Sequence, residues 1–184
     1  YKGNTKPKNN ASTIHGSIEK IRDRYYIFYH RSTNNTDYSR QCCAEEIHIA
    51  ADGSICQVDM TTSGIDGSPI KGKGSFQAGI CCNLITKKPI RLGIGKQQTL
   101  PRITEKDGKL ILADLTESTE AVYKYFDLSE TKEIIIHCRG NGIISCNGNT
   151  VDESGHCKLS GSNRDELHIR VENGKADIMS FELK

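Results

Sequence analysis

The feature that most constrains the fold of this chain is a five-residue run, Tyr25-Tyr26-Ile27-Phe28-Tyr29. Every residue in this run is aromatic or apolar, whereas a strand with one wet face alternates between apolar and polar side chains. A strand of this kind needs to be covered on both faces. A single sheet of about 60 residues is too small to supply both layers. The second layer therefore comes from the rest of the chain or from a neighbour that this sequence lacks.

The first 60 residues predict four consecutive antiparallel strands. The connections between them are short, and the last contains Asp52-Gly53, a strong turn signal. Four such strands form a meander, which is the unit of a propeller blade. The predicted strands are Ile14–Ile21, Tyr25–Arg31, Arg40–Ala50 and Ser54–Asp59.

The rest of the chain divides into a connecting region and a second β domain. Residues 61–101 are rich in Gly, Lys and small residues, and they indicate a linker with one or two connecting strands. Residues 102–184 predict short strands with a turn roughly every ten residues, which is typical of a β-sandwich or jelly roll. No convincing helical period occurs, so the predicted fold class is all-β. The predicted strands of the second domain are Lys109–Asp114, Glu120–Leu128, Glu133–Cys138, Ile143–Cys146, Cys157–Leu159, Glu166–Glu172 and Ala176–Leu183.

Charge and hydropathy exclude several classes of partner. The chain has 184 residues, with 25 Lys plus Arg and 23 Asp plus Glu, for a net charge of +2. This balance gives no support to a nucleic-acid-binding face or a polybasic membrane tail. No apolar run approaches the roughly 18 residues of a membrane span. The sequence has no initiator Met and no signal-peptide pattern, so we expect it to be a piece of a longer protein.

The eight cysteines do not form a metal or redox motif. They include two adjacent pairs and no C-x-x-C, which argues against a zinc ribbon or a thioredoxin-type site. We interpret them as buried free thiols in a reducing setting. A secreted disulfide framework is the alternative. The segment Gly67–Gly74 imitates a phosphate-binding loop, but Gly74 replaces the metal-binding hydroxyl and no strand-to-helix context surrounds it.

Two motifs carry a family resemblance. The first is His15-Gly16-Ser17-Ile18 followed by the aromatic run and His30-Arg31, and the second is Tyr38-Ser39-Arg40-Gln41-Cys42-Cys43-Ala44-Glu45. Together they resemble the closing blade of family 43 glycoside hydrolases, which are five-bladed β-propellers acting on arabinose- and xylose-containing polysaccharides. Residues 60–64 resemble the exit from that propeller. Residues 102–184 are similar to the appended β-sandwich of these enzymes, which is related to family 6 carbohydrate-binding modules.

The resemblance implies roles for two residues of the blade. His15 matches a histidine that supports a bound metal, commonly calcium, in the central channel, and Arg40 matches an arginine that reaches the sugar. A guanidinium fork suits both sugar hydroxyls and a neighbouring carboxylate. The residues alone also allow a structural, hydrogen-bonded His15. The family's catalytic Asp, Asp and Glu lie on earlier blades, so no catalytic residue is predicted in this chain. Glu45 and Glu46 cannot replace them, because consecutive strand residues face opposite ways.

The sandwich offers a second set of candidates. Family 6 modules often hold a structural calcium ion, and Glu105 and Asp177 are the corresponding oxygen ligands here. A solvated turn and a strand-edge charge are the alternative interpretations of these two residues. Tyr123 and Tyr125 share a predicted strand face, and they either stack on sugar rings or belong to the core.

The sequence leads to two functional hypotheses and a third, purely structural one, in which the chain is a domain that buttresses the missing propeller. In the first, the chain is the last four-stranded blade of a propeller followed by a β-sandwich, from a glycosidase that degrades xylan-type hemicellulose by inverting hydrolysis. Its partners are then an oligosaccharide or polysaccharide and the missing N-terminal blades. In the second, the chain is a non-catalytic carbohydrate-binding module. The cysteines favour a bacterial cytoplasm and the polysaccharide substrate favours secretion, so the localisation stays open.

Overall fold

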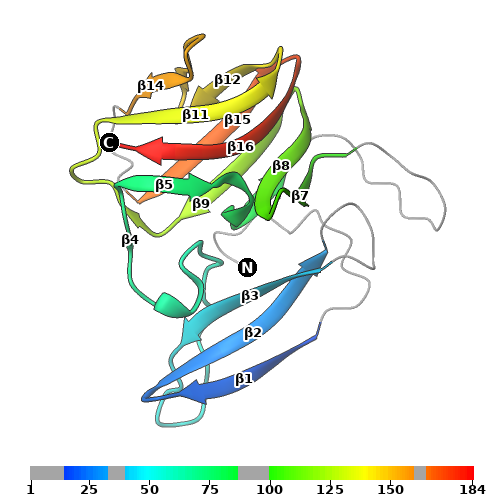
Figure 1. Cartoon of the computed structure of the whole chain (residues 1–184). Helices are drawn as coiled ribbons and strands as arrows, with labels where there is room; N and C mark the ends of the chain where they lie inside the picture. The colour runs from blue at the N-terminus through cyan, green and yellow to red at the C-terminus, as the bar shows by residue number, and fades with distance from the viewer. Residues whose placement is uncertain (1–14, 33–39, 87–99, 160–164) are drawn as a thin grey trace, which may run out of the picture.

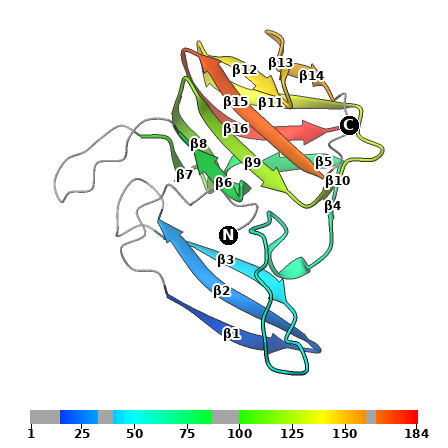
Figure 2. The same cartoon turned by 180° about the vertical axis from the view of Figure 1, so that it is seen from behind.

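A computed structural model describes residues 15–32, 40–86, 100–159 and 165–184 of the chain, and these residues form an all-β protein (Figures 1 and 2). The predicted fold class is therefore confirmed. The described helices are two 3-10 turns, η1 (Gly64–Asp66) and η2 (Ala78–Ile80). No helix in the described ranges is long and apolar enough to cross a membrane.

The N-terminal unit is a three-stranded antiparallel sheet. It contains β1 (Gly16–Ile21), β2 (Arg24–Ser32) and β3 (Arg40–Ile47), with β2 in the middle. Tyr29 lies opposite both Gly16 and Cys43 in the register. Strand β3 lies nearest to the second unit and β1 farthest from it, in both views. The predicted start of the first strand at Ile14, and residues 33–39 between β2 and β3, fall outside the described residues.

The predicted fourth strand, Ser54–Asp59, is not formed. Only one bridge, between Ile49 and Ile55, follows β3. It closes around Asp52-Gly53, where the Asp52 carboxylate accepts the Ser54 N–H at 2.9 Å. The chain does not add a fourth strand but returns to β3 through a side chain, because the Thr61 N–H donates to the Glu45 carboxylate at 2.8 Å. The unit therefore has three strands, and the propeller-blade assignment stays a prediction.

The second unit is a sandwich of two main sheets (Figures 1 and 2). One sheet has the order β14-β11-β16-β8-β7, with β5 also paired to β16, and the other has the order β13-β12-β15-β9-β6. A short parallel pair joins β4 to β10. The strands are β4 (Ile70–Lys71), β5 (Gly74–Gln77), β6 (Asn83–Ile85), β7 (Arg102–Lys106), β8 (Lys109–Thr116), β9 (Thr119–Lys124), β10 (Phe126–Asp127), β11 (Glu133–Gly140), β12 (Ile143–Cys146), β13 (Asn149–Thr150), β14 (His156–Lys158), β15 (Glu166–Asn173) and β16 (Lys175–Leu183).

The segment predicted as a linker, 61–101, supplies strands to the sandwich. Phe76 of β5 lies opposite Phe181 of β16, and Leu84 of β6 lies opposite Ala121 of β9. The sandwich therefore begins near Ile70 and not at Arg102. The sequence indicated one or two strands in this segment but not that they belong to the sandwich, because two of the strands are only two or three residues long and carry little periodicity.

The core of the sandwich is built around aromatic rings. Tyr123 and Phe181 are fully buried, with ring centroids 4.9 Å apart, and Phe76 contacts Phe126 at 5.3 Å. The expectation that Tyr123 and Tyr125 share a face is wrong. Tyr125 has a φ of 71°, which interrupts the alternation, and it is 40% exposed. Tyr123 is a core residue, whose hydroxyl donates to the Ala78 carbonyl at 2.8 Å.

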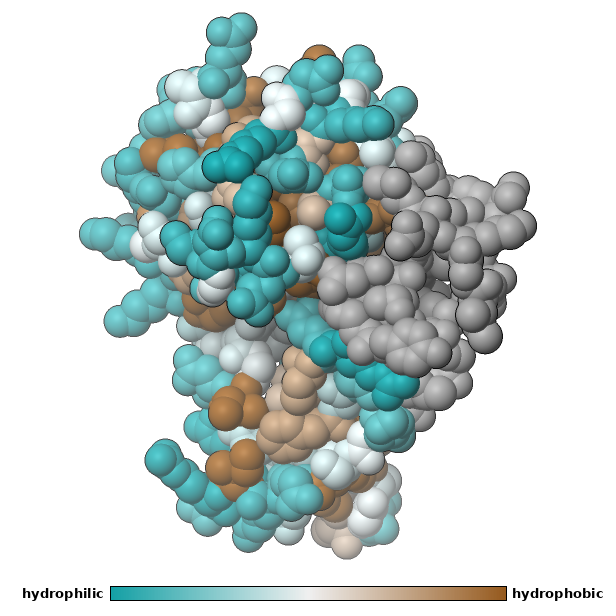
Figure 3. Space-filling model, turned by 45° about the vertical axis from the view of Figure 1, so that its right-hand side comes forward, coloured by the Kyte–Doolittle hydropathy of each residue, from teal (hydrophilic) through white to brown (hydrophobic). Residues whose placement is uncertain are grey.

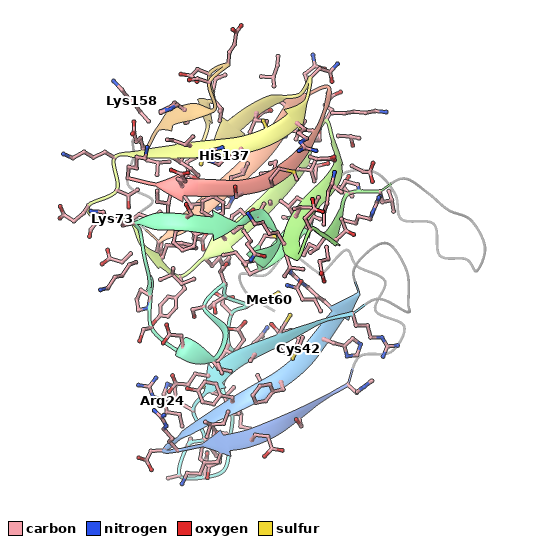
Figure 4. The ribbon with its side chains drawn as sticks, in the orientation of Figure 1. Arg24, Cys42, Met60, Lys73, His137 and Lys158 are labelled. Carbon is pink, nitrogen blue, oxygen red and sulfur yellow. The ribbon has the colours of Figure 1, made fainter. Side chains whose placement is uncertain are left out.

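A smaller apolar cluster joins the two units. Met60, Cys82 and Val122 are buried there, with Tyr29 and Ile85 packed against them. Figure 4 shows Met60 between the three-stranded sheet and the sandwich. The sandwich therefore covers part of the aromatic strand β2. Several apolar side chains of the N-terminal unit remain exposed, namely Ile18, Ile21, Tyr25, Ile49 and Ile55. Figure 3 shows hydrophobic residues at the lower part of the surface.

Candidate functional site

The two sequence-predicted residues of the blade lie at the same end of the three-stranded sheet. The His15 and His30 rings touch edge-on, with centroids 4.7 Å apart, and His30 lies opposite Cys42. Arg40 is two residues before Cys42 on β3 and shares its face. The exposed side chains of His15, Cys42 and Arg40 are thus brought to one face. Figure 4 shows Cys42 near this end and Arg24 at the opposite end.

The sequence reasoning missed His30 and Cys42 as neighbours of His15. Strand register identifies them, since Gly16 pairs with Tyr29 and Tyr29 with Cys43. The sequence could not provide that register, because no short turn fixes the pairing of β2 with β3.

At this end of the sheet, Arg31 lies on the other face and links β2 to the sandwich. Arg31 is buried, with only 7% of its surface exposed. Nε and Nη2 donate to Gln41 Oε1 at 2.8 and 2.6 Å, and Nη1 donates to the Cys82 carbonyl at 2.6 Å. Nη2 also donates to the Cys81 carbonyl. An arginine in an aromatic strand was the available sequence signal for this contact.

Glu45 is a buried carboxylate on the same face of the sheet as Arg31, the face that forms the junction with the sandwich. It accepts hydrogen bonds from the Thr61 N–H at 2.8 Å, the Thr61 hydroxyl at 2.7 Å and the Tyr29 hydroxyl at 3.3 Å. Burial raises the pKa of Glu45, and these hydrogen bonds only partly offset that effect. Its contacts make Glu45 a structural group.

The predicted calcium ligands of the sandwich do not come together. Asp177 lies between the buried residues Ala176 and Ile178, so its side chain points away from the core. Its carboxylate accepts the Asp114 N–H at 2.9 Å. Glu105 is exposed near the end of β7 and shares the inward-facing parity of buried Ile103. The two carboxylates therefore lie on opposite sides of their sheet and do not fit one calcium ion. Within the described ranges, no three His, Cys, Asp or Glu side chains gather closely enough to hold a metal ion.

The outer face of the second sheet carries a charged cluster around His168. Its Nδ1 is 3.0 Å from Glu120 and its Nε2 is 3.0 Å from Glu166. The hydrogen bond with Glu120, followed by that with Glu166, raises the pKa of His168 against the effect of burial. Lys124 is 3.5 Å from Glu166 on the same face. The cluster links β9 to β15 and is a stabilising feature.

The cysteines are free in the described structure, but the expectation that they are buried is wrong for Cys42, Cys56 and Cys138, which are exposed. Five of the eight are buried or half-buried, and burial raises the pKa of the Cys82 thiol to about 12. Thiols with such a high pKa are poor nucleophiles at neutral pH. They act here as small apolar side chains.

Comparisons with known proteins connect this fold to glycosidases. No family model matches the chain. A protein of Thermoclostridium stercorarium named xylosidase/arabinosidase is 40% identical over 149 residues, which cover 76% of this chain. The chain spans about a third (32%) of the length of that relative. It is thus related to a glycosidase, which confirms the broader part of the resemblance.

One solved structure shows a weaker likeness. This is a domain named CsCBM6-3 from Clostridium stercorarium in complex with cellobiose, with a TM-score of 0.47 and 10% sequence identity. The likeness covers 64% of this chain and 98% of that domain. It is too low to support an argument about binding.

Proposed function

We propose that this chain is the C-terminal portion of a glycoside hydrolase that acts on arabinose- and xylose-containing plant polysaccharides. The observation that carries the proposal is the 40% identity with a xylosidase/arabinosidase over 149 residues. The three-stranded sheet then corresponds to the last propeller blade, and the sandwich is its appended domain. The partners are a hemicellulose oligosaccharide or polysaccharide and the upstream blades of the same enzyme.

Arg40 and His15 are the substrate-facing residues in this proposal. Both are exposed at one end of the sheet, on the face turned away from the sandwich. A guanidinium at this position binds sugar hydroxyls and holds a nearby carboxylate ionised. The His15–His30 contact sets the orientation of the His15 ring.

The catalytic carboxylates belong to upstream blades. Inverting hydrolysis requires two carboxyl groups roughly 6.5–9.5 Å apart with a water between them. Glu45 is buried and accepts three hydrogen bonds, and Glu46 points to the opposite face, where it pairs with Arg24 at 3.3 Å. Neither is available to flank a glycosidic bond. This supports a chain that contributes to substrate binding without the acid and the base.

A chimeric enzyme tests the proposal. The segment of the xylosidase/arabinosidase that this chain matches is replaced by the chain, and hydrolysis of arabinoxylan oligosaccharides is followed by proton NMR of the anomeric signals. We expect activity with inversion in the chimera, a loss of about 100-fold or more with Arg40→Ala, and little change with Arg24→Ala. The isolated chain should form no product. Product formation by the chain alone would refute the upstream position of the carboxylates.

One observation favours the alternative of a carbohydrate-binding module. Tyr125 projects from the sandwich with 40% of its surface exposed, and an exposed ring of this kind can stack on a sugar. If the sandwich binds by itself, oligosaccharide binding survives deletion of residues 1–60 and is lost in Tyr125→Ala. Binding that requires Arg40 instead supports the hydrolase proposal.

The calcium assignment stays a prediction. The pair Glu105 and Asp177 does not suit one ion, which leaves His15 as the remaining candidate for indirect support through water. The measurement is the melting temperature with calcium and with a chelator. A calcium-dependent increase that persists in Asp177→Asn but disappears in His15→Gln would place the ion at the sheet.

A further inference from the structure

The end of the sheet that carries His15 and Arg40 is attached to the sandwich by side-chain hydrogen bonds to an irregular backbone segment. Residues 79–82 run from η2 into β6 inside the protein, and Gly79, Cys81 and Cys82 are buried. Buried backbone carbonyls outside regular strands need hydrogen-bond donors. The donors here are Arg31, to Cys81 and Cys82, and the Gln41 amide, 3.5 Å from the Gly79 carbonyl.

Arg31 and Gln41 form one polar unit. The Gln41 Oε1 atom accepts two hydrogen bonds from the Arg31 guanidinium, while the Gln41 amide nitrogen reaches the sandwich. The two residues lie opposite each other on β2 and β3. The planar fork of an arginine can satisfy several acceptors in one plane, which a lysine cannot do.

Each member of this unit is adjacent in sequence to a residue of the substrate-facing end. Arg31 follows His30, whose ring contacts His15, and Gln41 follows Arg40. Alternation along a strand places these neighbours on the opposite face. The backbone that the sandwich holds on one side therefore carries His15, His30 and Arg40 on the other.

We propose that Arg31 is a positioning residue: together with Gln41, it fixes the His15–Arg40 end of the sheet against the sandwich. The inference rests on the proposed function, in which His15 and Arg40 face the sugar. The sandwich then acts as a brace for the substrate-facing end and not only as an independent module.

The test uses three variants of the 184-residue chain. Arg31→Lys keeps the charge but loses the fork, and Gln41→Leu removes the amide bridge. Arg24→Lys is the matched control, because Arg24 lies on the same strand and bonds to the Glu46 side chain, not to the sandwich. Histidine ring signals are recorded by NMR, with His137 and His156 of the sandwich as internal references.

We expect the His15 and His30 signals to move in Arg31→Lys and Gln41→Leu, while the sandwich histidines keep their positions. Arg24→Lys should leave all of them in place. If Arg31→Lys does not fold, Gln41→Leu decides the outcome. Unchanged His15 and His30 signals in a folded Gln41→Leu chain would overturn the inference.

Binding of an arabinoxylan oligosaccharide to the chimeric enzyme, which supplies the upstream blades, provides the functional arm. We expect Arg31→Lys and Gln41→Leu to weaken binding by about threefold or more, with Arg24→Lys at the wild-type value. If wild type does not bind but the ring signals still move, the proposed function fails and the coupling is supported. Wild-type binding that neither junction variant changes would refute the positioning role.

Discussion

Glu45 and Glu46 are consecutive on β3, yet their carboxylates lie in different environments. Glu45 is 5% exposed and accepts hydrogen bonds from Thr61 and Tyr29. Glu46 points to the other face of the sheet and forms an ion pair there with Arg24. The alternation of side chains along a strand separates them. Each carboxylate is consequently committed to a structural partner.

The first prediction concerns the charge on Glu45. Because burial raises its pKa in the folded state, the folded protein prefers the protonated acid, and stability falls as pH rises from the unfolded pKa of about 4.3 through the raised folded value. Glu45→Gln removes this dependence. Urea unfolding from about pH 4 to about pH 7 should show the variant gaining stability relative to wild type as pH increases. A constant difference across this range would contradict the prediction.

Arg31→Met should be strongly destabilising. The substitution leaves the buried Cys81 and Cys82 carbonyls without their donor, and we expect a loss of about 3 kcal/mol in the free energy of unfolding. Arg24→Met removes an exposed, solvent-screened ion pair and should cost much less than Arg31→Met. Chemical unfolding curves measure both. Equal effects of the two substitutions would show that the junction contributes little.

His168 should make the stability of the sandwich depend on pH. Its raised pKa means that its contribution is fully present below the unfolded pKa of about 6.5 and is lost as pH rises through the folded value. His168→Gln should lower stability by about 0.5–1 kcal/mol near pH 6, with a smaller loss near about pH 9. Melting temperatures measure the difference, and His48→Gln, at an exposed position, is the control.

The two tyrosines that flank Lys124 should respond differently to substitution. Tyr123→Phe leaves the Ala78 carbonyl without its donor in the core and should cost about 1–3 kcal/mol. Tyr125→Ala removes an exposed ring and should change stability by about 0.5 kcal/mol or less. Thermal unfolding measures the loss of stability in each of the two variants. A larger loss for Tyr125→Ala would mean that its ring is packed.

Thiol reactivity should follow exposure. The three exposed cysteines, Cys42, Cys56 and Cys138, should react with a disulfide reagent in the native state, and all eight in denaturant. Cys138 should be the slowest of the three, because partial burial raises its pKa. The absorbance of the thiolate that the reagent releases gives the number of cysteines that have reacted. Rapid reaction of Cys146 or Cys157 in the native state would contradict their burial.

Local sequence patterns predicted most strands of the sandwich, but they missed β7 and predicted one strand, Glu120–Leu128, where Tyr125 separates β9 from β10. β12 matches its predicted bounds, Ile143–Cys146, and the apolar alternation of β15 and β16 appears in their burial. The joining of residues 70–85 to both sheets was not predictable, because these pairings are long-range and the strands are too short to show a period. The same holds for Tyr125, since a left-handed backbone at a tyrosine has no sequence signal.

For the candidate site, motif resemblance selected His15 and Arg40, and strand pairing supplied their surroundings. His30 and Cys42 became neighbours of His15 only once the register was known. The arginine in the aromatic strand was a signal that Arg31 has a buried partner, but the sequence could not identify that partner, because its acceptors lie 50 and 51 residues away. Contacts of this kind depend on the packing of two units, which a local pattern does not contain.

The position of β16 has a consequence for synthesis of the protein on the ribosome. This last described strand lies between β11 and β8 and also pairs with β5, and it contributes Ile178, Phe181 and Leu183 to the core. A nascent chain that ends before β16 holds these three strands without their common neighbour, with their apolar faces open to water. The sandwich can therefore close only after translation has passed Leu183, and until then a chaperone would find exposed strand edges to bind.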